Sequence, residues 1–123
     1  DAPEMIGGAC LEGLVAQNLR AWIAYSKSDC ELYFWRTKSG VEADFILYGQ
    51  DTFLAIEVKS ARSVCRKDVR ALVTFRKDYP ETQACLLYGG SERLKINGVQ
   101  CLPCDEFLRN LVPNVCPTEI LDA

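Results

Sequence analysis

Apolar residues between positions 9 and 25 return every three or four positions, which is the spacing of one face of a helix. Projected at about 100° per residue, Glu12 falls inside the apolar arc of this predicted helix. Gln17 and Arg20 fall outside it. One carboxylate of the first helix is therefore expected to point toward the core.

Beyond this helix the pattern changes to short apolar runs separated by turn signals such as Lys38-Ser39-Gly40. The predicted strands are 31–37, 41–48, 52–59, 83–88 and 98–102, and two further helices are predicted at 64–79 and 103–111. The order α-β-β-β-α-β, followed by β-α, predicts an α/β fold with a mixed central sheet flanked by helices. One domain is expected over 1–111, with a loosely attached, proline-containing tail over 112–123.

The third predicted strand, FLAIEVKS at 53–60, carries two charged residues at its end. Side chains alternate across a strand, so Glu57 and Lys59 share a face. Burying either charge is costly unless it is paired or binds something. If the second and third strands pair, Asp44 and Glu57 can converge, and Glu12 can reach them from a helix packed on that face. Carboxylates of this kind suit Mg²⁺, which prefers hard oxygen ligands.

A structural interpretation of the same residues remains open. Glu57 and Lys59 can form an ordinary, partly buried ion pair. On that interpretation Asp44 is a hydrogen-bonded strand residue and Glu12 lies at the rim of the core.

The composition is that of a soluble globular domain, with 123 residues, 49% hydrophobic and 25% charged. Apolar stretches are far too short to span a membrane, and no signal peptide is visible, so a cytoplasmic protein without membrane contact is expected. Because the chain begins at Asp1, we expect a processed chain or a piece of a larger one.

The net charge of −3 argues against nucleic-acid binding, but the charge is unevenly distributed. Between 59 and 77 there are seven basic residues and one acidic residue, so this segment carries +6 and the remainder −9. The segment directly follows the strand that carries Glu57. It is either a phosphate-binding surface or a solvated helix face.

Seven cysteines and no histidines are present. The odd number and the apolar neighbours indicate reduced, packed thiols and not a disulfide framework. Cys101 and Cys104 form a CLPC motif between a predicted strand and a helix, which is also the setting of a thioredoxin-type redox pair. Packed thiols and a redox or metal pair are the two interpretations of this motif.

Four segments in order resemble the PD-(D/E)XK nuclease superfamily and, more closely, the C-terminal domain of a family of prokaryotic AAA-type ATPases. They are GGACLEGLVAQNLRAW (7–22), ELYFWRTKSGVEADFIL (31–47), AIEVKS (55–60) and FRKDYPE (75–81). The resemblance covers about 7–111 and implies a restriction-endonuclease-like fold. Two departures are visible: Ala43 replaces the proline of the superfamily name, and no GxxxxGK(S/T) loop is present, so the sequence holds no ATPase motor.

Residue by residue, the resemblance implies Asp44 and Glu57 as metal ligands, with the Val58 carbonyl as a third. It implies Lys59 as the catalytic lysine and Glu12 as an additional acidic ligand or a group that orients water. The implied cofactor is Mg²⁺ or Mn²⁺.

Two functions are therefore expected as alternatives. The first is a metal-dependent DNA nuclease (a hydrolase) that forms the C-terminal module of a larger ATPase and contacts the N-terminal ATPase portion of its parent chain. The second is a catalytically silent interaction or oligomerisation module with the same fold. In the first, DNA phosphates are bound by Arg62, Arg66, Arg70 and Lys77.

Overall fold

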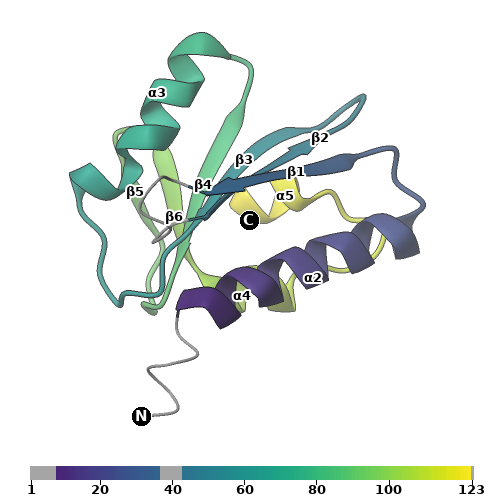
Figure 1. Ribbon diagram of the computed structural model, residues 1–123, viewed down its shortest axis with the longest axis horizontal. Helices are drawn as coiled ribbons and strands as arrows, with labels where there is room; N and C mark the ends of the chain where they lie inside the picture. The colour runs from purple at the N-terminus through teal and green to yellow at the C-terminus, as the bar shows by residue number, and fades with distance from the viewer. Residues whose placement is uncertain (1–7, 37–42, 123) are drawn as a thin grey trace.

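The computed structural model describes residues 8–36 and 43–122, and within them the side chains of 11–34 and 45–122. Figure 1 shows a sheet with helices on both sides. The elements are α2 Gly8–Ser26, β1 Glu31–Arg36, β2 Ala43–Tyr48, β3 Phe53–Val58, the 3-10 turn η1 Arg66–Val69, α3 Arg70–Asp78, β4 Gln83–Tyr88, β5 Leu94–Ile96, β6 Val99–Pro103, α4 Cys104–Arg109 and α5 Pro117–Asp122. None of these helices is long and apolar enough to cross a membrane.

The described strands form one mixed, open sheet of six strands in the order β1-β2-β3-β4-β6-β5. The first three form an antiparallel meander. β4 pairs parallel to β3, and β6 pairs parallel to β4, while β5 closes the far edge as an antiparallel hairpin with β6. Parallel pairing of β3 and β4 requires a crossover, which η1 and α3 supply. The molecule therefore has an α/β fold.

The sheet has a hydrophobic core on each face, because alternate residues of its central strands point to opposite sides. In β3, Leu54, Ile56 and Val58 belong to the first core, which α2, α4 and α5 cover. Ala55 belongs to the second core, which lies beneath α3. Figure 1 shows α3 on one side of the sheet and α2 on the other. This two-sided burial explains the nearly continuous apolar run of β4.

Two local structures differ from the sequence prediction. The predicted helix at 64–79 begins as η1, because Asp68 accepts a hydrogen bond from the Cys65 backbone N–H at 2.8 Å and so caps a short turn. The strand β5 was missed. Its signal is the dipeptide Asn97-Gly98, whose positive φ values of 51° and 83° suit the tight turn of the β5–β6 hairpin.

The segment after α4 is packed against the rest of the chain, contrary to the expectation of a loose tail. Ile120 and Leu121 of α5 are 3% and 4% exposed and lie in the first core. The indole Nε1 of Trp22 donates a hydrogen bond to the Val115 carbonyl at 2.9 Å, which ties the segment to α2. Pro117 is the first residue of α5, where the backbone N–H that proline lacks would have no partner within the helix.

Candidate functional site

Asp44 and Glu57 lie directly opposite each other in the antiparallel register of β2 and β3. Residues in such opposed positions share a face of the sheet, about 5 Å apart between their Cβ positions. The alternation along each strand therefore brings together the two positions expected to bind metal. The side chain of Asp44 lies outside the described residues, so the register is the evidence for this pair.

Glu57 is buried, with 1% of its surface exposed, on the face of the sheet that α3 covers. Its backbone also pairs in register with Leu86 of β4, which belongs to the second core. A carboxylate in such apolar surroundings requires compensation by charge or hydrogen bonds. Burial to this degree is unusual for a glutamate.

Lys59 forms an ion pair with Asp68, a residue that the sequence analysis did not select. The Lys59 Nζ lies 2.6 Å from Asp68 Oδ1, and the side chains are 23% and 6% exposed. Burial by itself would raise the pKa of Asp68, but the hydrogen bonds from Lys59 and from Cys65 outweigh it and lower the pKa. The sequence signal that was missed is the spacing Cys65-x-x-Asp68, typical of a reciprocal cap.

Glu12 is buried, at 5% exposure, as its position in the apolar arc of the first helix predicts. The helix itself does not pack on the expected face. α2 packs on the first core with Leu54 and Ile56, whereas Glu57 faces the other side of the sheet. Figure 1 shows the N-terminal end of α2 near the end of the sheet at which β3 finishes. Glu12 therefore belongs to a helix that packs on the other face of the sheet from Glu57.

Among the residues with described side chains, no group of three His, Cys, Asp or Glu side chains is arranged to hold a metal ion. Glu12, Glu57 and Asp68 are included in that statement, and Asp44 is not. The described carboxylates alone therefore do not form a metal centre.

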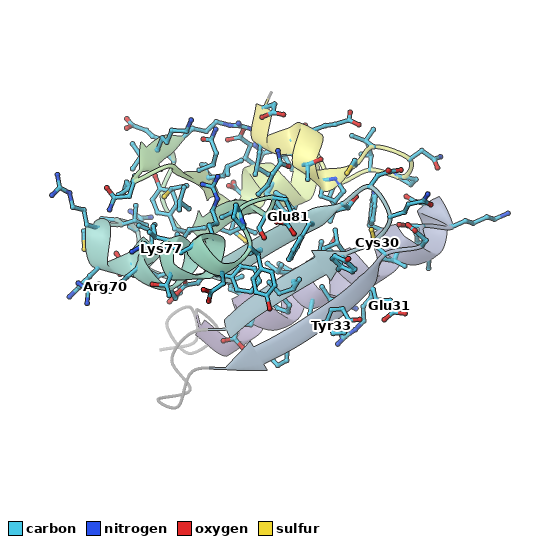
Figure 2. The ribbon with its side chains drawn as sticks, turned by 90° about the horizontal axis from the view of Figure 1, so that it is seen from above. Cys30, Glu31, Tyr33, Arg70, Lys77 and Glu81 are labelled. Atoms are coloured by element: carbon cyan, nitrogen blue, oxygen red, sulfur yellow. The ribbon has the colours of Figure 1, made fainter. Side chains whose placement is uncertain are left out.

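The basic residues after β3 divide into an exposed group and one structural arginine. The exposed group is Arg62, Arg66, Lys67, Arg70 and Lys77. Arg76 is half-buried and donates hydrogen bonds to the carbonyls of Thr82 and Gly98, both at 3.1 Å, so it joins α3 to the β5–β6 turn. Figure 2 shows Arg70 and Lys77 at the same end of the molecule.

The CLPC cysteines lie on opposite faces of the sheet. Cys101 belongs to the second core and Cys104 to the first. Burial raises the pKa of Cys101 to about 11, and a nearby Asp68 contributes. Burial also raises the pKa of Cys104 to about 12. A redox pair needs an accessible thiolate near its partner, so the burial of these thiols in two different cores favours the interpretation as packed thiols.

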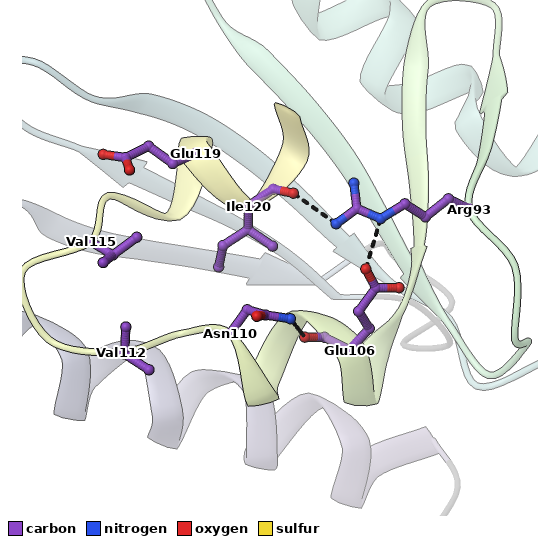
Figure 3. A pocket seen from close by; sticks show the side chains of 7 residues that line it. All are labelled: Arg93, Glu106, Asn110, Val112, Val115, Glu119 and Ile120. Atoms are coloured by element: carbon purple, nitrogen blue, oxygen red, sulfur yellow. Dashed lines mark hydrogen bonds and ion pairs between the residues drawn. The ribbon is translucent and has the colours of Figure 1, made fainter. Parts of the chain in front are cut away.

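A cavity of about 470 Å³ lies between α4 and α5, and Figure 3 shows its lining. Arg93 lies in the wall of this cavity, and its guanidinium binds groups of the same chain. Its Nε donates to Glu106 Oε2 at 2.8 Å, and its other nitrogens donate to the carbonyls of Ile120 at 2.8 Å and Leu121 at 3.3 Å. Cations at a helix C-terminus are stabilising, so Arg93 anchors α5.

Comparison with known proteins identifies one family. A family model described as "Domain of unknown function (DUF4143)" matches residues 7–107. The searches of curated proteins and of solved structures gave no match. The matched span runs from the residue before α2 into α4 and contains the whole sheet. The chain belongs to the DUF4143 family.

Proposed function

We propose that this domain has a restriction-endonuclease-like fold and hydrolyses DNA phosphodiester bonds with a divalent metal ion. The observation that carries the proposal is the register of Asp44 opposite Glu57 on β2 and β3. The element order α2-β1-β2-β3-α3-β4 supports the fold, because it is the α-β-β-β-α-β order that the resemblance implies.

The residues present fit a hard divalent cation such as Mg²⁺ or Mn²⁺. The carboxylates of Asp44 and Glu57 and the carbonyl of Val58 would hold it, since all three supply oxygen ligands. A cation there would also offset the cost of burying Glu57, which is 1% exposed. When bound, such an ion offsets phosphate charge and makes water more acidic.

The other groups would act on the nucleophile and on the substrate. The ammonium of Lys59 would orient or deprotonate the attacking water, and the contact with Asp68 at 2.6 Å would hold that ammonium near the end of β3. Glu12 would act as a further acidic ligand or orient water, from the end of α2 that lies near the end of β3. The exposed arginines after β3 would bind DNA phosphates, which must approach against the field of the carboxylates.

A second candidate function is a catalytically silent interaction module of a larger ATPase chain. It is favoured by the Lys59–Asp68 ion pair, because a lysine already neutralised by a buried carboxylate is less available to a nucleophile. In that case the polar residues at the end of β3 would be structural, and the partner would be the N-terminal ATPase portion of the parent chain.

The decisive experiment combines a cleavage assay with a metal soak. Linear duplex DNA is incubated with the chain and Mg²⁺ or Mn²⁺, and Glu57→Gln and Lys59→Ala are compared with the exposed-surface controls Glu81→Gln and Lys95→Ala. Loss of cleavage in the first two variants but not in the controls supports the nuclease.

Crystals soaked in Mn²⁺ are examined for an anomalous peak between Asp44 and Glu57. If wild-type chain neither cleaves DNA nor shows that peak, the nuclease proposal fails and the silent module is the better conclusion. Cleavage that persists in Lys59→Ala would instead remove that lysine from the mechanism.

A further inference from the structure

On the α3 side of the sheet, Tyr33 of β1 and Tyr48 at the end of β2 are only partly covered by the described residues. α3 packs over β3 and β4. Tyr33 lies opposite Ile46 in the β1–β2 register, and Ile46 belongs to the second core, so Tyr33 and Tyr48 share the α3 side of the sheet. Each of these tyrosines is 51% exposed. Two large, half-exposed rings therefore stand on this surface of the described sheet.

These rings border an acidic pocket of about 380 Å³, lined by Asp29, Glu31, Tyr33, Tyr48, Gly49 and Gln50. Both carboxylates are exposed and are held in place: Tyr33 Oη donates to Glu31 Oε1 at 2.9 Å, and the Gln50 N–H donates to Asp29 Oδ2 at 3.0 Å. Neither carboxylate has a cationic partner among the described residues. Aromatic faces next to carboxylates attract a guanidinium by stacking, cation–π contact and charge.

The chain presents matching cations elsewhere. Arg66, Arg70 and Lys77 are exposed in a segment that carries +6, whereas the remainder of the chain carries −9. Arg66 and Arg70 are four positions apart, and neither is in an ion pair with a described residue. Figure 2 shows Arg70 and Lys77 at one end of the molecule and Glu31 and Tyr33 toward the other. Arg70 of one copy therefore lies away from the pocket residues Glu31 and Tyr33 of the same copy.

We propose that this acidic pocket receives the guanidinium of Arg66 or Arg70 from a second copy of the chain, so that copies associate head to tail. This goes beyond DNA cleavage, because it assigns an interaction surface that does not include Asp44 or Glu57. The two surfaces differ, so the contact is heterologous, and a pair of copies retains one unused pocket and one unused basic surface. Such contacts continue into a closed ring or an open chain.

Sedimentation velocity on the 123-residue chain tests this directly. One variant, Asp29→Lys with Glu31→Lys, reverses the pocket, and another, Arg66→Glu with Arg70→Glu, reverses the basic surface. Wild type should associate with rising concentration, and about 1 M salt should weaken this, because the Debye length falls to about 3 Å. Each variant alone should self-associate at least about tenfold more weakly, since charged contacts of this kind contribute about 1.5–3 kcal/mol.

The sharpest result comes from mixing the two variants. The pocket-reversed variant keeps an intact basic surface, and the arginine-reversed variant keeps an intact pocket, so the mixture should associate where each variant alone does not. Charge-matched controls are Glu81→Lys with Glu92→Lys, and Arg20→Glu with Lys95→Glu, all at exposed positions. These controls should associate like wild type.

Three outcomes overturn the proposal: a wild-type chain that stays monomeric at all concentrations, association that survives both reversals, or a mixture that remains monomeric. Glu31→Lys alone keeps the Asp29 hydrogen bond to Gln50 and replaces the pocket double variant if that variant fails to fold. The cleavage assay separates this contact from the nuclease, because the pocket-reversed variant should cut DNA normally.

Discussion

The ion pair between Lys59 and Asp68 should respond unequally to removal of its two partners. Lys59→Met leaves Asp68, whose side chain is 6% exposed, with the backbone N–H and the thiol of Cys65 as its remaining hydrogen-bond partners. Asp68→Asn instead leaves Lys59, which is 23% exposed and can turn its ammonium toward water. Lys59→Met should therefore lower the free energy of unfolding more than Asp68→Asn does.

The expected magnitudes follow from that difference in burial. Removing one partner of a fully buried pair costs about 3–5 kcal/mol, and the partial exposure of Lys59 reduces this to about 2–3 kcal/mol for Lys59→Met. Asp68→Asn should cost about 1–2 kcal/mol, because an amide oxygen can still accept the hydrogen bond from Cys65. Since residues in contact are not additive, the double variant should show a coupling of about 1–2 kcal/mol.

Urea unfolding of the wild type, both single variants and the double variant measures this coupling. The pKa of Asp68 is lowered in the folded state, so its stabilising contribution is complete above the unfolded pKa of about 3.9 and declines as the pH falls through the folded value. Asp68→Asn should therefore flatten the loss of stability in acid. A coupling below about 0.3 kcal/mol would contradict this reasoning, and so would a loss of stability in acid that is as steep in Asp68→Asn as in the wild type.

Three further predictions concern other parts of the chain. Replacing Arg66 and Arg70 by Ala should weaken DNA binding about equally across sequences and flatten the slope of log K against log salt concentration by up to about 2 units. Binding titrations at several salt concentrations would measure this slope. Unchanged binding would instead favour a helix face that is only solvated. Burial raises the pKa of Cys104 to about 12, so iodoacetamide near neutral pH should modify exposed Cys65 and spare Cys104, which mass spectrometry can check. Phe107→Ala should cost about 3–5 kcal/mol in urea unfolding, because this ring is fully buried in the first core; a cost below about 1 kcal/mol would mean that the core closes around the gap.

Much of the fold was predictable because it depends on local alternation. The apolar run at 83–88 coincides with β4, and the aromatic and β-branched runs coincide with β1, β2 and β3. The second strand of the edge hairpin was predicted near 98–102, but β5 was missed because it has only three residues, Leu94–Ile96. A period-two pattern cannot be recognised over so short a run, although the Asn97-Gly98 turn was readable.

Contacts between segments that are far apart in the chain could not be predicted from the sequence. Alternation could place Asp44 beside Glu57, because both positions follow from pairing adjacent strands. It could not tell which face α2 covers, since that depends on how the chain crosses the sheet, and the helix that carries Glu12 was assigned to the wrong face as a result. Asp68 was missed as the partner of Lys59 because their contact requires η1 to fold back over the end of β3.

DNA and a second copy of the chain would compete for the same arginine side chains. If Arg66 and Arg70 bind phosphates, they are unavailable to the pocket formed by Glu31 and its neighbours on another copy. Coupling between two binding events is reciprocal, so DNA should dissociate the head-to-tail contact, and raising the protein concentration should weaken DNA binding per copy. The pocket-reversed variant provides the control, because it cannot receive arginines and its affinity for DNA should not depend on protein concentration. Sedimentation with labelled duplex would detect this; if DNA and copies bind together without competition, at least one of the two uses assigned to these arginines is wrong.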